Sequence, residues 1–159
     1  MLKVKVITVG SIKEKYLREA SAEYVKRISG FASVEVVELK ESPLPENPNA
    51  EQIKNALDAE AVNILASIPQ RAYAVALCVE GKQLSSEELA DKLADVTNES
   101  SCVCFVIGSS HGLSDKVKSA ANMRLSFSKM TFPHQLMRVI LLEQIYRGFM
   151  INSGRKYHK

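Results

Sequence analysis

The sequence predicts an α/β protein whose mostly parallel sheet carries helices on both faces. Runs with a strand-like pattern alternate along the chain with longer segments of helical spacing, which is typical of this class. Two of the runs, 73–79 and 102–107, are apolar at nearly every position, as strands are when helices cover both sides of a parallel sheet. At 159 residues the chain is expected to form one domain, 1–159.

Each element has its own signal. The expected strands lie at 3–9, 33–39, 73–79, 102–107 and 123–127, and the expected helices at 14–29, 49–68, 85–96, 114–121 and from Pro133 onward. Asn49 is suited to cap the second helix, and Ser85 with Glu88 has the spacing of a capping box. Pro133 fits the first turn of the last helix, where no N–H is needed.

The connections and the last helix carry further information. The three prolines of segment 41–49 indicate a loop, and residues 80–82 are expected to form a turn. The last helix is apolar on so many sides that it must be buried on more than one of them. One side can therefore meet the core of the domain and another a second copy of the chain.

Charge is distributed unevenly along the chain. The net charge is +3, but residues 1–115 hold 12 basic and 17 acidic side chains, a balance of −5. Residues 116–159 hold nine basic side chains and one acid, Glu143, a balance of +8. A basic C-terminal quarter favours an anionic partner, with RNA or DNA first, although a solvated basic face gives the same pattern.

The sequence also constrains compartment and redox state. No apolar run is long enough to cross a membrane, and the start of the chain alternates like a strand and lacks the apolar block of a signal peptide. Cys78, Cys102 and Cys104 lie in apolar runs without metal-ligand spacing, which indicates buried free thiols. We therefore expect a cytoplasmic protein with no membrane partner.

Three loops are expected to converge at one edge of the sheet. They follow the three most apolar strands and lie at 77–82, 108–112 and 128–133. Because parallel sheets bind ligands beyond the carboxyl ends of their strands, these loops predict a small-molecule pocket.

Several chemistries lack their signatures. The segment from Gly108 to Gly112 is neither a dinucleotide-binding fingerprint nor a P-loop, which weakens a nicotinamide-dependent oxidoreductase. His111, His134 and His158 have no ligand partners at metal spacing, so no metal site is expected. No nucleophile elbow or other hydrolase constellation is evident.

Four motifs together resemble a known family. They are FVIG at 105–108, LSFSKMTFPHQLMR at 125–138, EQIYR at 143–147 and YHK at 157–159. The chain closely resembles the RlmH family, the bacterial ribosomal large-subunit pseudouridine N3-methyltransferases of the SPOUT class. The resemblance covers the whole chain, and the run from Ser128 to Arg138 is its most specific part.

The resemblance implies a C-terminal trefoil knot, a homodimer and the cofactor S-adenosylmethionine in a bent conformation. Its target would be N3 of a pseudouridine in large-subunit rRNA, methylated on the assembled ribosome. Matching positions would hold the cofactor through Leu77, Gly108, Phe127, Ser128, Lys129, Met130, Thr131 and Phe132. Arg147, Tyr157 and His158 would reach the target base or its phosphates, and His158 is the candidate proton acceptor.

The chain departs from the family at three places. Ser109 stands where a second glycine is usual, and at a positive φ it would cost about 1 kcal/mol. Cys78 replaces an acid, and Arg155-Lys156 replaces a tail in which proline more often precedes the tyrosine. Because of Ser109, a non-catalytic RNA- or ribosome-binding module of the same fold is the alternative function.

Overall fold

The computed structural model describes residues 1–157, and over this range strands and helices alternate. Their order is β1 (Lys3–Val9), α1 (Lys15–Ile28), β2 (Ser33–Leu39), α2 (Ala50–Ser67), β3 (Tyr73–Gln83), α3 (Ser86–Glu99), β4 (Cys102–Ile107), α4 (Asp115–Ala120), β5 (Met123–Ser126) and α5 (His134–Asn152). The expected alternation of strands and helices is confirmed. No helix in the described range is long and apolar enough to cross a membrane.

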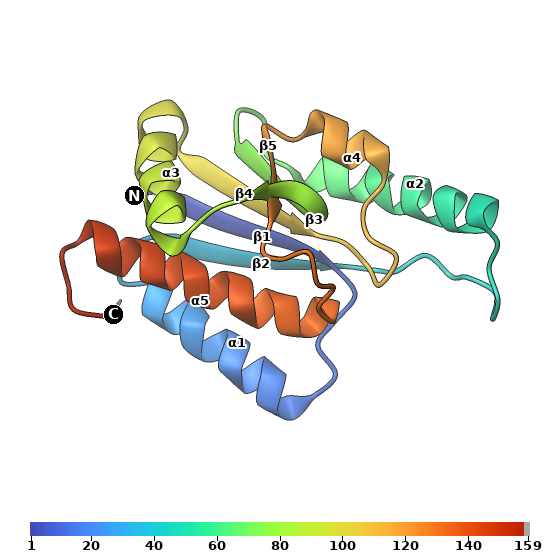
Figure 1. Ribbon diagram of the computed structural model, residues 1–159, viewed down its shortest axis with the longest axis horizontal. Helices are drawn as coiled ribbons and strands as arrows, with labels where there is room; N and C mark the ends of the chain where they lie inside the picture. Colours follow the sequence, from blue (N-terminus) through green and yellow to red (C-terminus); the bar gives the residue numbers. More distant parts are fainter. Residues whose placement is uncertain (158–159) are drawn as a thin grey trace.

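The strands form one sheet in the order β2-β1-β4-β3-β5, and all four neighbouring pairs in the described chain are parallel. Figure 1 shows α1, α3 and α5 on one face of this sheet and α2 and α4 on the other. The predicted architecture, a parallel sheet covered on both faces, is therefore confirmed. Its physical origin is the apolar character of the central strands; every residue of β4 is buried.

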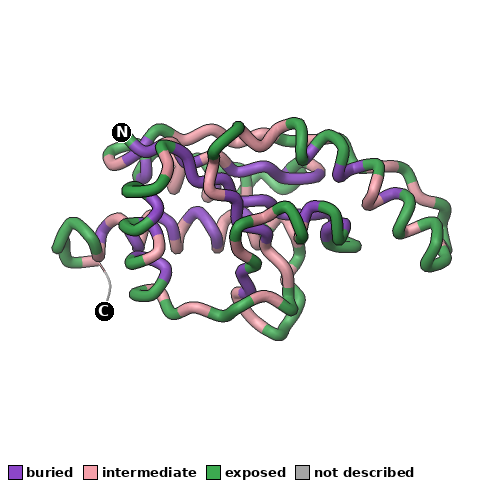
Figure 2. The backbone as a smooth tube through the Cα atoms, turned by 90° about the horizontal axis from the view of Figure 1, so that it is seen from above, coloured by how far each residue is buried: buried purple, intermediate pink, exposed green. Residues whose placement is uncertain are grey.

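Two apolar cores lie on the two sides of the sheet. The larger packs Phe105 of β4 against Leu93 of α3 and Leu141 of α5. The smaller packs Val106 against Ile64 of α2 and Val117 of α4. Figure 2 shows the buried stretches through the middle of the molecule, while the loop at 41–49 and the start of α2 are mostly exposed.

The helix starts follow the capping signals with one correction. Asn49 and Ser85 both form complete capping boxes, with Gln52 and Glu88 respectively. Pro133 does not lie in the first helical turn: it occupies the N-cap of α5, with φ −55° and ψ 135°, and the helix begins at His134. A proline favours this extended conformation as readily as the first turn, so the sequence signal was ambiguous by one residue.

The expected turn at 80–82 is wrong. β3 continues to Gln83, and after a register shift Lys82 and Gln83 pair with Leu125 and Ser126 of β5. Gly81 permits this irregular pairing, because a Cβ at its position would lie 2.8 Å from backbone atoms of β5. The glycine therefore marks a close approach between two strands, which sequence alone does not distinguish from a turn.

The last helix is enclosed by two neighbours. α5 packs against both α1 and α3, as its all-round apolar pattern predicted. Gly148 allows the contact with α3, since a Cβ there would lie 2.8 Å from Cδ1 of Leu93. The start of α5 lies at the carboxyl ends of the strands and its end at their amino ends, so this helix spans the molecule.

Candidate functional site at the carboxyl edge of the sheet

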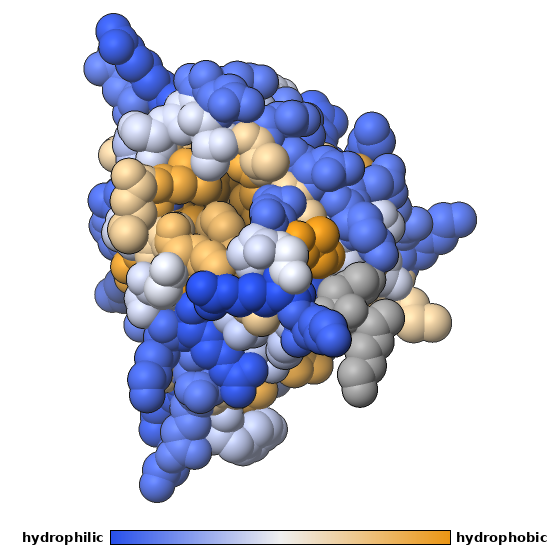
Figure 3. Space-filling model, turned by 90° about the vertical axis from the view of Figure 1, so that its left-hand side faces the viewer, coloured by the Kyte–Doolittle hydropathy of each residue, from blue (hydrophilic) through white to orange (hydrophobic). Residues whose placement is uncertain are grey.

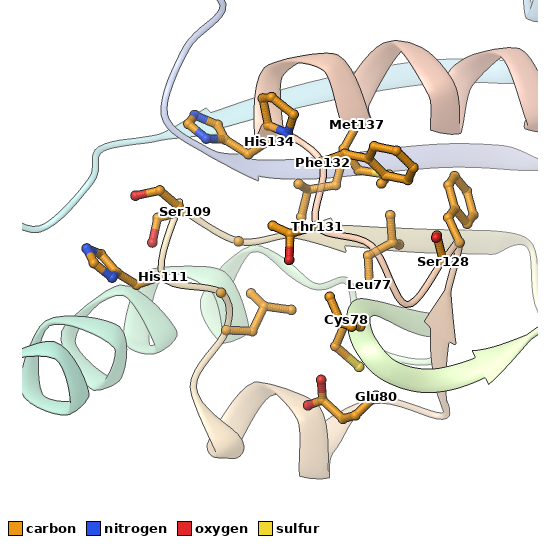
Figure 4. A pocket seen from close by; sticks show the side chains of 18 of the residues that line it. Leu77, Cys78, Glu80, Ser109, His111, Ser128, Thr131, Phe132, His134 and Met137 are labelled. Atoms are coloured by element: carbon orange, nitrogen blue, oxygen red, sulfur yellow. The ribbon is translucent and has the colours of Figure 1, made fainter. Parts of the chain in front are cut away.

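A cavity of about 670 Å³ opens at the carboxyl edge of the sheet. Its lining comes from the ends of β3, β4 and β5 and from the start of α5, and the three predicted loops therefore meet (Figure 4). The lining residues are 77–80, 107–113, 118, 125, 127–128, 130–134 and 137. A cavity of this size is typical of small-molecule sites.

The predicted cofactor residues meet at this cavity. Leu77, Gly108, Phe127, Ser128, Met130, Thr131 and Phe132 all line it. Lys129 is the exception: it belongs to the same loop but does not line the cavity. In Figure 4 Thr131 lies near the centre of the cavity, between Leu77 and the loop that carries Ser109.

The cavity combines apolar walls with a charged rim. Leu77, Phe127, Phe132 and Met137 supply apolar surface, which suits a flat aromatic ligand. At the rim, Lys118 Nζ lies 2.6 Å from Glu80 Oε1, and this ion pair lowers the pKa of the Glu80 carboxyl. Glu80 is therefore ionised at neutral pH, and its charge at the rim is already paired with that of Lys118.

The loop that follows β4 is held closed by a glycine contact. An added Cβ at Gly108 would lie 2.2 Å from the carbonyl oxygen of Gly112, so no larger residue fits without movement. Ser109 lies between them, and its carbonyl accepts a hydrogen bond from the Gly112 N–H at 2.9 Å. Ser109 does not have a positive φ, so the strain that a serine was expected to cause is absent.

Two carboxylates of α2 support this loop from behind. Ser114 Oγ donates a hydrogen bond to Asp58 Oδ1 at 2.6 Å, which lowers the pKa of Asp58. Glu60 is 5% exposed and accepts a hydrogen bond from the Ser42 N–H at 2.9 Å. The pKa of Glu60 is raised because the carboxyl is buried. Hydrogen bonds from the Ser42 N–H and the Ser109 hydroxyl act in the opposite direction but do not outweigh burial. The loop is thus fixed near both of its ends.

The start of α5 is anchored to β1 and β2. Arg138 is 6% exposed and donates hydrogen bonds to Glu38 Oε2 and Thr8 Oγ1, both at 2.9 Å, and to the Gly10 carbonyl at 3.3 Å. Gln135 Oε1 accepts a hydrogen bond from the Lys13 N–H at 3.0 Å. These contacts fix the wall of the cavity that the start of α5 supplies.

The predicted catalytic residues lie elsewhere. Arg147 is 13 positions after His134, so the two are about 20 Å apart along the helix. Arg147 Nε donates to Glu143 Oε1 at 3.0 Å, and the Tyr157 hydroxyl donates to the same oxygen at 3.3 Å. The Arg147 guanidinium also stacks over the Tyr157 ring at 4.8 Å. His158 lies outside the described residues.

These tail residues lie beside the C-terminal half of α5, away from the cavity at the start of this helix. Figure 3 faces the side on which the N-terminus and the end of α5 lie, and it shows hydrophilic side chains around an apolar hollow. Within one chain, the cavity and the cluster of Arg147 and Tyr157 are therefore separate sites.

Several lining residues were not among the predicted cofactor contacts. Cys78, Glu80, His111, Lys118, His134 and Met137 all line the cavity. Cys78, Glu80 and His111 lie in the predicted loops and His134 directly follows one. Their place just after the strands was therefore the sequence signal that could have identified them. Lys118 of α4 and Met137 of α5 reach the cavity through the packing of their helices, for which the sequence holds no local signal. In the part of the chain that the structure describes, no cluster of three potential metal ligands occurs.

The fold and the cavity define a class: a parallel α/β protein with a cavity where its strands end, which is where such sheets place their ligand sites. A family model described as "Predicted SPOUT methyltransferase" matches residues 2–158. Two proteins named "Ribosomal RNA large subunit methyltransferase H" are similar to this chain over 159 residues. The one from Streptococcus thermophilus is 50% identical and the one from Clostridioides difficile 47%, and each match covers 99% of this chain and 100% of the relative. The chain therefore belongs to the SPOUT methyltransferase family and, within it, to the RlmH family, as the motifs predicted.

Two solved structures share the fold. A probable methylase family protein from Haemophilus influenzae Rd KW20 has a TM-score of 0.53 and 13% identity, covering 99% of this chain and 70% of that one. The tRNA (m1G37) methyltransferase from Aquifex aeolicus has a TM-score of 0.53 and 15% identity, covering 92% of this chain and 69% of that one. At this identity the likeness shows the fold alone.

Proposed function

We propose that this protein is an S-adenosylmethionine-dependent rRNA methyltransferase that methylates N3 of a pseudouridine in the large subunit. The observation that carries the proposal is the cavity built by the three loops, in a chain that matches the methyltransferase H relatives along their whole length. The pseudouridine and the N3 position come from the family resemblance. Membership of the SPOUT family implies a methyl donor of the S-adenosylmethionine type.

The residues of the cavity fit this cofactor. Its apolar walls suit an adenine ring, and its volume of about 670 Å³ lies in the usual range for cofactor sites. Leu77, Gly108 and the loop from Phe127 to Phe132 would hold it, with Gly108 letting the backbone approach closely. When bound, the cofactor supplies an electrophilic methyl group on a sulfonium.

We further propose that the whole chain, 1–159, is one SPOUT domain whose C-terminal half forms a trefoil knot. The knot comes from the family resemblance, and two observations describe the path of the chain after β5. β5 is an edge strand, yet the chain returns from it so that α5 packs between α1 and α3. Arg138 then reaches Thr8 of β1, three strands away from β5 in the sheet.

The active protein is proposed to be a homodimer. Leu136 of α5 is exposed and Val139 is half-buried although both are apolar, which supports a partner on this side of the helix. Arg147 is also about 15 Å along α5 from Met137, the last residue of this helix that lines the cavity, and this separation supports a dimer as well. Two antiparallel copies of α5 would bring the tail of one chain to the cavity of the other.

Methyl transfer from a sulfonium requires mainly that the protein position the two reactants and stabilise the charge that develops on the base. N3 of the base must lose its proton, and we propose His158 as the proton acceptor. Arg147 or another tail cation would stabilise the anion that develops on the base. Glu143 holds the Arg147 guanidinium and raises its pKa, so this cation stays charged throughout. The assembled ribosome in the cytoplasm is the proposed substrate.

Two measurements test this function. Calorimetric titration with S-adenosylmethionine is expected to show one site per chain, and labelled methyl should then pass to large-subunit rRNA. No transfer to any RNA, together with no measurable binding of the cofactor, would favour the non-catalytic binding module. Failure to bind the cofactor at all would contradict the proposal.

A further inference from the structure

A second cavity adjoins the first. It has a volume of about 350 Å³ and lies between the start of α3, the loop before α5 and α5 itself. Leu125, Phe127 and Phe132 line both cavities. The two cavities therefore adjoin at these three side chains. Leu84, Leu89 and Ile140 give it further apolar wall.

The polar edge of this cavity is a fixed hydrogen-bond chain. Ser86 Oγ donates to Gln144 Oε1 at 2.6 Å, and Gln144 Nε2 donates to Glu143 Oε2 at 2.8 Å. A carboxylate only accepts hydrogen bonds, so Glu143 fixes which end of the amide faces it. The other carboxylate oxygen, Oε1, is engaged by Arg147. The Gln144 carbonyl oxygen therefore points to Ser86 and the cavity.

The polar edge formed by Ser86 and Gln144 is complementary to a ligand that donates a hydrogen bond. The Ser86 proton is already given to Gln144, so both oxygens offer only lone pairs. The best complement is a flat molecule with apolar faces and an N–H on its rim. A nucleobase has this form, and enzymes that act on bases read their edges by hydrogen bonds while apolar side chains cover their faces.

Resting on the function proposed above, we propose that the second cavity holds the target base and that Gln144 selects pseudouridine over uridine. Pseudouridine carries N–H groups at N1 and N3, on either side of C2. One base can therefore direct N3 toward the cofactor pocket and its N1–H toward Gln144 Oε1. Uridine is attached to its sugar through N1 and has no N–H at that position, so the Gln144 oxygen keeps its bond from Ser86 but its second lone pair receives no donor from the base.

The test compares two substrates. Ribosomes whose target position is pseudouridine and ribosomes in which it remains uridine are assayed for methyl transfer with the parent chain and with Gln144→Leu. We expect the parent to prefer pseudouridine. Gln144→Leu should lower kcat/KM on pseudouridine by about tenfold or more and leave that on uridine nearly unchanged. S-adenosylmethionine should bind both proteins equally.

Two further variants make the result specific. Gln144→Asn keeps the amide but withdraws it by one methylene, and it should lose the same preference if Gln144→Leu folds poorly. Gln83→Leu makes the same change at an exposed position outside the cavity and should behave like the parent. An unchanged preference in both Gln144 variants, or no preference in the parent, would overturn this inference while leaving the methyltransferase activity intact. Absence of transfer by the parent would instead reject the proposed function.

Discussion

Gly108 and Gly112 touch so closely that a single methyl group on Gly108 would lie 2.2 Å from the Gly112 carbonyl oxygen. Gly108→Ala must therefore displace the loop that lines the cavity between β4 and α4. We expect cofactor affinity to fall by at least tenfold while the fold remains, as measured by calorimetry and thermal unfolding. Gly30→Ala is the control, since its added Cβ would meet the nearest backbone atom at an ordinary 3.6 Å. Equal affinity of Gly108→Ala and the parent would show that this loop does not hold the cofactor.

Arg138 links α5 to two strands at a buried position. Arg138→Met removes its bonds to Glu38, Thr8 and the Gly10 carbonyl and leaves these groups without their partner. We expect the free energy of unfolding to fall by about 2–3 kcal/mol in a denaturant titration. Arg124→Met, at an exposed arginine, should change it by less than about 0.5 kcal/mol. A similar small loss for Arg138→Met would mean that its contacts do not anchor the helix.

Glu60 should make stability depend on pH in a defined direction. Burial raises its pKa above the ordinary 4.5, so the folded protein holds this proton more tightly than the unfolded chain. Its contribution to folding is therefore full below that ordinary value and is lost as the pH rises through the folded pKa. Glu60→Gln keeps an acceptor for the Ser42 N–H and removes the buried charge.

We expect Glu60→Gln to unfold at a higher temperature than the parent at about pH 7, and this advantage to vanish at about pH 4. Thermal unfolding followed by circular dichroism across this range provides the measurement. Glu46→Gln, at an exposed glutamate, should shift neither curve. A lower unfolding temperature for Glu60→Gln at neutral pH would show that the ionised carboxylate stabilises the loop.

Cys78 provides a chemical probe of the cavity. Its side chain lines the cavity, and burial raises the pKa of its thiol, so alkylation at about pH 7 should be slow but measurable. S-adenosylhomocysteine at saturation should slow it further, as followed by mass spectrometry. Cys102 and Cys104 are buried, and burial raises the pKa of Cys104 to about 12, so neither should react in the folded protein. An alkylation rate of Cys78 that is the same with and without saturating S-adenosylhomocysteine would show that the cofactor binds elsewhere.

Much of the fold followed from local signals in the sequence. The apolar runs of β3 and β4 predicted a covered parallel sheet, and their position predicted that residues 77 and 108 would lie at one edge. Capping at Asn49 and Ser85 depends on neighbours within one helical turn, so sequence alone sufficed. The extension of β3 past Glu80 was missed because it depends on pairing with β5, which is distant along the chain.

The site was predictable only where strand order determines it. The loops at 77–80 and 108–112 follow their strands, whereas Lys118 reaches the rim through the packing of α4. The motifs supplied the proposed cofactor positions, but not the separation of Arg147 from the cavity. That separation comes from the length of α5, whose 19 residues run from the carboxyl ends of the strands toward their amino ends.

Transfer of a labelled methyl group from S-adenosylmethionine tests the central claim most directly. The substrates would be ribosomes that lack this modification, free large-subunit rRNA and isolated large subunits, and the label would be mapped by nuclease digestion and mass spectrometry. We expect the label at N3 of one pseudouridine of the large-subunit rRNA in whole ribosomes. No label on any of the three substrates, from a protein that binds S-adenosylmethionine normally, would contradict the claim.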